Sequence, residues 1–170
     1  MTKIISCTVP TAMRAEEVVG RLQSAGFPNS SISVLFAQGA SSHLEIERHT
    51  KAPEGAVAGG AAVGLLGGVL GWLVGIGSLA IPGVGPFIAA GPIMAALGGV
   101  AAGTVAGGLI GSLVGLGIPE MEAKHYESRL KEGHALISVH AADDIEVKKA
   151  RDVFKDCGGE EISESRDIAA

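Results

Sequence analysis

The chain has 170 residues, a formal net charge of −5 and 47% hydrophobic residues. The acidic balance argues against the concentrated basic face that nucleic-acid binding requires, so we expect no nucleic-acid partner. The length suits one domain, or one small domain with an insertion. Cys7 and Cys157 are the only cysteines in the sequence. We expect no secretory leader, and the wide separation of the two cysteines then favours reduced thiols over a disulfide framework.

Residues 1–42 have the pattern of a strand, a helix and a second strand. Lys3–Val9 is rich in β-branched residues and ends at Pro10. Thr11 is a suitable N-cap for an amphipathic helix that extends to Ala25, because apolar residues recur there at helical spacing. Residues 31–36 alternate in the way that predicts the second strand.

Residues 43–54 form a polar connector that contains two histidines and two glutamates in alternation. If the connector is extended, His43, Glu45, Glu47 and His49 share one face, and these side chains are suitable zinc ligands. A solvated connector without a metal explains the same residues. Nothing in the sequence enforces a coordination geometry, so the four residues are weak metal candidates and we expect no cofactor.

Residues 55–118 form an apolar segment with no Asp, Glu, Lys, Arg or His, and it contains 20 of the 26 glycines. The pattern predicts two helices, over 56–79 and 93–116, because prolines are absent from both stretches and concentrate between them. Each helix would be about 36 Å long, which is enough to cross the hydrocarbon core of a bilayer.

The glycines of this segment recur at every fourth residue, so they lie on one face of each predicted helix. The first helix has Gly60, Gly64 and Gly68 in one row and Gly67, Gly71 and Gly75 in another, and the second has Gly99, Gly103, Gly107, Gly111 and Gly115. Such rows are typical of helices that pack closely in membranes. In water a helical glycine costs about 1 kcal/mol relative to alanine, so we predict that these residues mediate extensive self-association.

The sequence leaves two environments open for the hairpin. Its length suits a lipid bilayer, with both termini in the cytoplasm and the charged domain associated with the membrane. However, Trp72 lies inside the first helix rather than at an interface, and the flanks carry charges of both signs. The alternative is a cytoplasmic soluble assembly in which the hairpins of several copies form a lipid-free core.

Residues 119–170 complete a second α+β half. A polar helix over 119–131 is followed by a strand over 134–141. Asp143 and Glu146 then have the spacing of a capping box for a helix that ends near Cys157, and residues 160–163 predict a last short strand.

Together the elements predict an α+β fold, namely a ferredoxin-like βαββαβ sandwich with the glycine-zipper helical hairpin inserted between its second and third strands. Residues 1–42 would form the first half of the domain, 43–54 the connector, 55–118 the hairpin, and 119–170 the connecting helix and second half. In so small a sandwich one face of the sheet stays open unless a partner covers it, so dimerisation through that face is a further expectation.

The sequence resembles a family of bacterial general stress proteins, described as heat- or low-temperature-induced and without an assigned activity. The resemblance lies in Ile81-Pro82-Gly83-Val84-Gly85-Pro86, Ala89-Ala90-Gly91-Pro92, residues 111–117 and Ile118-Pro119-Glu120, with Ala123, Tyr126, Gly133 and the strand at 135–139. It implies a stress-linked bacterial protein with a hydrophobic centre, and it transfers no catalytic residue.

We therefore expect a non-enzymatic, stress-associated structural protein that forms homo-oligomers through its glycine rows, inserted in a membrane. One alternative is a lipid-free cage or filament with the hairpins packed inside. A second alternative, from another functional class, is a module that binds a small ligand or a metal.

Overall fold

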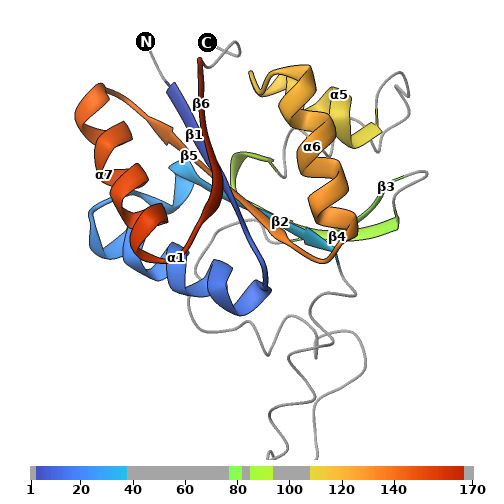
Figure 1. Cartoon of the computed structure of the whole chain (residues 1–170), viewed down its shortest axis with the longest axis horizontal. Helices are drawn as coiled ribbons and strands as arrows, with labels where there is room; N and C mark the ends of the chain where they lie inside the picture. Colours follow the sequence, from blue (N-terminus) through green and yellow to red (C-terminus); the bar gives the residue numbers. More distant parts are fainter. Residues whose placement is uncertain (1–2, 38–76, 82–84, 94–107, 167–170) are drawn as a thin grey trace, which may run out of the picture.

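A computed structural model of the chain describes residues 3–37, 77–81, 85–93 and 108–166 (Figure 1). In chain order the elements are β1 (Lys3–Val9), α1 (Ala12–Ser24), the 3₁₀ turn η1 (Asn29–Ser31), β2 (Ile32–Ala37), β3 (Gly77–Ile81), β4 (Gly85–Ala90), α5 (Gly108–Gly115), α6 (Glu120–Lys131), β5 (Ala135–Ala141), α7 (Asp144–Asp156) and β6 (Glu160–Arg166). The fold is α+β, which confirms the predicted class.

The capping signals in the sequence determine where two of the helices begin. The backbone N–H of Arg14 donates to Thr11 Oγ1 at 3.2 Å at the start of α1. At the start of α7, the N–H of Glu146 donates to Asp143 Oδ1 at 2.8 Å. The carboxylate of Glu146 in turn accepts a 2.7 Å hydrogen bond from the N–H of Ala142, which is a reciprocal arrangement of the kind predicted from the Asp143 and Glu146 spacing.

The described strands form one six-stranded sheet with the order β3-β4-β2-β5-β1-β6, in which every neighbouring pair is antiparallel. The register is regular at the centre, where Val139 of β5 pairs with Ile5 on one side and Ile32 on the other. At the outer strand β6, the register with β1 shifts between Ser6 and Thr8. This shift marks a β-bulge, and Glu161 of β6 lies within it.

Helices cover both faces of the sheet, and Figure 1 shows them as two separate pairs. Helices α1 and α7 pack on the face of Ile5 and Ile137, where Val18 and Phe154 complete the core. Helices α5 and α6 pack on the opposite face, and their core residues are Leu109, Leu113, Ala123, Tyr126 and Leu130, against Leu35, Phe87 and Leu136 of the sheet. The expectation of an open sheet face is therefore wrong, because α5 and α6 of the same chain cover that face with their apolar sides.

The apolar segment differs from the predicted pair of helices joined by an irregular breaker. Gly77–Ile81 is strand β3 rather than the end of the helix over 56–79, and Gly85–Ala90 is strand β4. Strand β4 pairs with β2 from Val34↔Ala90 to Ala37↔Phe87. Pro86 is itself part of β4 and lies opposite Ala80 of β3. A proline that predicted a helix break is thus accommodated in a strand.

The second half of the segment agrees with the prediction where it is described. Gly108–Gly115 is α-helical, as expected for the end of the helix over 93–116. The predicted connector at 43–54 and most of the first predicted helix lie outside the described residues. Among the described residues, no helix has both the length and the apolar character needed to cross a bilayer.

Candidate functional site

Most of the glycines predicted to mediate self-association lie outside the described residues. These are Gly60, Gly64, Gly68, Gly67, Gly71, Gly75, Gly99, Gly103 and Gly107. The last two members of the second row, Gly111 and Gly115, are described, and both belong to α5. These two positions are the part of the predicted interface that the structure describes.

Helix α5 has a buried leucine face and an exposed glycine face. Leu109 and Leu113 are 1% and 0% exposed and contribute to the core shared with α6. Gly111 and Gly115 are exposed, and a Cβ atom built at either position meets no described atom within 4 Å beyond its chain neighbours and the backbone of its own helix. Val114 lies between them in sequence and is also exposed. The two glycines are therefore not required for packing α5 against the described part of its own chain.

The predicted metal candidates His43, Glu45, Glu47 and His49 lie outside the described residues, so the metal hypothesis remains a prediction. Within the described ranges, no group of three or more His, Cys, Asp or Glu side chains is arranged to hold a metal ion.

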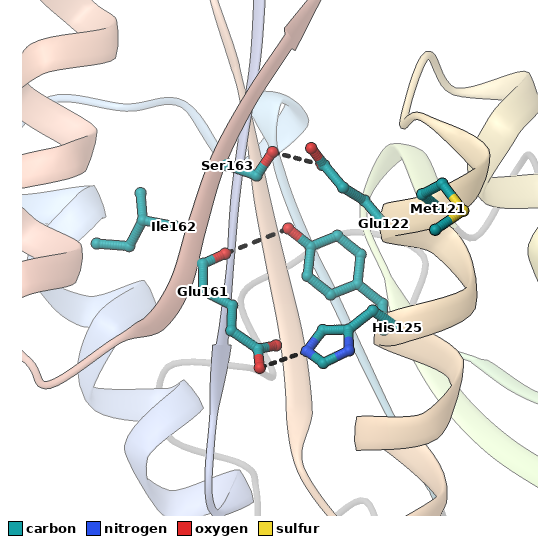
Figure 2. A pocket seen from close by; sticks show the side chains of 7 residues that line it. Met121, Glu122, His125, Glu161, Ile162 and Ser163 are labelled. Atoms are coloured by element: carbon teal, nitrogen blue, oxygen red, sulfur yellow. Dashed lines mark hydrogen bonds and ion pairs between the residues drawn. The ribbon is translucent and has the colours of Figure 1, made fainter.

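A second candidate site, which the sequence did not predict, is a pocket of about 440 Å³ between α6 and β6. Its lining residues are Met121, Glu122, His125, Tyr126, Glu161, Ile162 and Ser163. Figure 2 shows the side chains of Glu122 and His125 extending from α6 towards β6, and the hydroxyl of Tyr126 reaches the same strand. The side chain of Ile162 points to the other side of the strand, where it packs against the core of α1 and α7.

Glu161 lies in the bulge of β6 and joins the strand to α6. Its φ of 54° makes it the one non-glycine residue with positive φ in the described chain, and such a backbone conformation costs about 1 kcal/mol or more for an L-residue. Oε1 of its carboxylate lies 2.5 Å from His125 Nε2 and 2.9 Å from Arg129 Nε. Its backbone carbonyl accepts a 3.3 Å hydrogen bond from the Tyr126 hydroxyl. The bulge thus directs both polar groups of Glu161 towards α6.

The electrostatics of this cluster favour an ionised Glu161. Partial burial would raise the pKa of its carboxyl, but the hydrogen bonds and charges of His125 and Arg129 outweigh burial and hold the pKa below its usual range. The Tyr126 hydroxyl behaves oppositely, because its burial, reinforced by the nearby Glu122 carboxylate, raises its pKa well above the usual range. Tyr126 therefore acts here as a neutral hydrogen-bond donor.

A row of serines crosses the sheet beside this pocket. The registers align Ser33 of β2, Ser138 of β5, Ser6 of β1 and Ser163 of β6 on the face below α6. Ser33 Oγ accepts a 3.2 Å hydrogen bond from the N–H of Ile93, and Ser163 Oγ donates to the Glu122 carboxylate. These small side chains leave room over the sheet for the ring of Tyr126, which is 2% exposed.

The pocket was missed because its two walls are distant in sequence. Tyr126 and Glu161 are 35 residues apart, and periodicity within one element does not reveal which elements become neighbours. One usable signal was present: serines occupy the middle of three predicted strands, at Ser6, Ser33 and Ser138, where purely apolar packing would favour β-branched residues.

Comparisons of the chain with protein-family models, with curated proteins and with solved structures give no match. The resemblance to bacterial general stress proteins stays a prediction.

Proposed function

We propose that this chain is a non-enzymatic structural protein that self-associates through the exposed glycine face of α5 to form a lipid-free homo-oligomer. The open space above Gly111 and Gly115 carries the proposal. A glycine in a helix interior costs about 1 kcal/mol relative to alanine, and no contact within the described chain offsets this cost. A second copy packed against α5 would offset it, because glycines allow two backbones to approach closely.

The proposal includes a ferredoxin-like βαββαβ unit as the scaffold that presents this face. The partial order β6-β1-β5-β2 with antiparallel neighbours, and the packing of α1 and α7 on one face, support this topology. The glycine-rich segment is then an insertion between β2 and β5. It adds β3 and β4 beside β2 and brings α5 to the second face, next to α6.

Strand β4 is the reason for proposing a lipid-free assembly instead of the membrane hairpin expected first. A bilayer hairpin with its turn at residues 81–92 would hold that turn about 36 Å from the domain, at the far end of two helices. Phe87 and Ala90, which belong to that stretch, pair instead with Ala37 and Val34 of β2 inside the domain. The role in stress and the cytoplasmic location of the termini stay predictions.

The test is the mass of the assembly in detergent-free buffer, measured by light scattering on a sizing column. We expect the wild type at a multiple of the 17.1 kDa chain, and a lower mass for Gly111→Leu and Gly115→Leu. Because open space surrounds both positions, neither leucine should disturb the fold, which circular dichroism checks. Ser128→Leu, which adds a leucine at an exposed position of α6, is the matched control and should retain the wild-type mass. A monomeric wild type, or glycine variants of unchanged mass, would contradict the proposal.

A further inference from the structure

Helices α5 and α6 are joined into one rigid unit, which we call the α5–α6 unit (residues 108–131). The N–H of Ile118 donates to the carbonyl of Leu113 at 3.1 Å and closes the turn between the two helices. Ile118 is buried, and the helices share one hydrophobic cluster that includes Leu113 of α5 and Leu130 of α6. A movement of α6 away from the sheet would therefore carry α5 with it.

Three side chains of α6 bond to a single residue of the sheet, Glu161 of β6. His125 Nε2 lies 2.5 Å and Arg129 Nε 2.9 Å from its carboxylate Oε1, and Figure 2 shows this carboxylate turned towards His125. The Tyr126 hydroxyl donates to its backbone carbonyl at 3.3 Å. Glu161 also has the φ of 54°, and a strained backbone persists where surrounding contacts impose it. Separation of α6 from β6 would thus break these bonds and release the strain at the same residue.

The sheet face beneath the α5–α6 unit is more polar than the opposite face. Ile5, Cys7 and Val9 of β1 belong to the core under α1 and α7. Ser6 and Thr8 alternate with them on the side of the α5–α6 unit, and both are buried. A hydroxyl regains hydrogen bonds to water when it is uncovered, whereas apolar surface costs about 25 cal/mol per Å². Uncovering this face therefore costs less per unit area than uncovering the face of α1 and α7.

We propose that the α5–α6 unit opens from the sheet as a whole while the core under α1 and α7 stays packed, and that Glu161 is the latch that holds it closed. Such an opening is a partial unfolding with a lower free energy than unfolding of the whole domain. It uncovers the hydroxyls of the sheet and allows the bulge of β6 to relax. The inference goes beyond self-association and does not depend on it, because every contact that carries it lies within one chain.

The test is native-state labelling with iodoacetamide in two variants of the full chain, Ala123→Cys and Ala150→Cys. Ala123 lies on the buried face of α6 and Ala150 on that of α7, and both are 0% exposed. Mass spectrometry of peptides distinguishes each new thiol from the buried Cys7 and Cys157. We expect Ala123→Cys to react at least tenfold faster than Ala150→Cys, because the opening exposes the first position and leaves the second covered.

A further substitution on each side of the sheet shows which opening the labelling follows. Val18→Ala weakens the core of α1 and α7. It should speed labelling of Ala150→Cys by about tenfold or more and leave labelling of Ala123→Cys unchanged. Glu161→Gln should speed labelling of Ala123→Cys by about fivefold. Equal rates at the two cysteines, acceleration of both by Val18→Ala, or no effect of Glu161→Gln on Ala123→Cys would each overturn the proposal.

Amide hydrogen exchange without added cysteines gives a second measurement, which serves if either cysteine variant fails to fold. A helix as short as α6 is marginal in water once it leaves its core, so the opening exposes its amides to exchange. Val18→Ala should speed exchange in α7 and leave the exchange of Tyr126 and Leu130 unchanged. Equal acceleration in both helices would show that α6 separates only when the whole domain unfolds, and it would overturn the proposal.

Discussion

Arg129 and Glu161 connect the outer helix α6 to the bulge of β6, since Nε of Arg129 lies 2.9 Å from Oε1 of Glu161. The other carboxylate oxygen accepts a 3.3 Å hydrogen bond from Thr8 Oγ1 on β1. One side chain thereby links two strands and a helix. We infer that Glu161 fixes the position of α6 over the sheet, and that the strained backbone of the bulge is maintained by these contacts.

Replacing Glu161 with glutamine should lower the free energy of unfolding by about 1 kcal/mol, because hydrogen bonds to a charged acceptor become bonds to a neutral one. Chemical denaturation measures this change. Glu120→Gln breaks an exposed pair with Lys124 on the same helix and should have a smaller effect, since exposed ion pairs contribute little. Equal losses in the two variants would show that Glu161 is an ordinary surface charge.

The backbone at position 161 can be tested separately from its carboxylate. Both Glu161→Ala and Glu161→Gly remove the side-chain contacts, but only glycine adopts a φ of 54° without strain. The glycine variant should therefore be more stable than the alanine variant by about 1 kcal/mol in thermal or chemical unfolding. If alanine is as stable as glycine, the bulge does not retain its positive φ in solution.

The stability of the protein should decrease in acid in a way that depends on Glu161. The pKa of this carboxyl is lower in the folded chain than in the unfolded chain, so its contribution is complete above the unfolded pKa of about 4.3 and is lost as the pH falls through the folded pKa. The difference in unfolding free energy between wild type and Glu161→Gln should be largest near neutral pH and should shrink below about pH 4. A difference that is constant with pH would contradict this assignment.

Gly91 should be essential for seating β4 against β2. It has a φ of 80°, and a Cβ atom there would lie 1.9 Å from the backbone oxygen of Ile32. Gly26, after α1, has a φ of 97° but open space around its Cβ position. Gly26→Ala should lose about 1 kcal/mol from backbone strain alone, while Gly91→Ala should lose clearly more, as measured by chemical denaturation. Similar losses would mean that the close contact with Ile32 is not maintained.

The sequence predicted the elements whose signals are local. The strand at Lys3–Val9 and the helices beginning after Thr11 and Asp143 follow from β-branched residues and capping side chains, which act within a few residues. The strands β3 and β4 were not predicted, because a short apolar run between glycines and prolines fits a buried strand as well as a helix end. Pairing with β2 decides between the two, and that partner is distant in sequence.

The candidate sites were likewise predictable only where their signal is local in sequence. The four-residue spacing indicated the glycine row, and its two described members, Gly111 and Gly115, are exposed; that the row faces another molecule stays a prediction. The pocket at Glu122 and Glu161 could not be anticipated, because it depends on which strand neighbours α6 and on a bulge at one residue. Neither property is encoded in a local periodicity.

The most direct test of the proposed assembly is cross-linking between copies at Val114, which lies between Gly111 and Gly115 and is exposed. Val114→Cys and Ile145→Cys, the latter exposed on α7 across the sheet, would each be treated with a short bismaleimide under native conditions. The native Cys7 and Cys157 are 0% and 3% exposed, so both should react slowly. We predict rapid cross-linked dimers for Val114→Cys and none above background for Ile145→Cys. Equal yields at the two positions, or no dimers at Val114→Cys, would contradict self-association through the glycine face of α5.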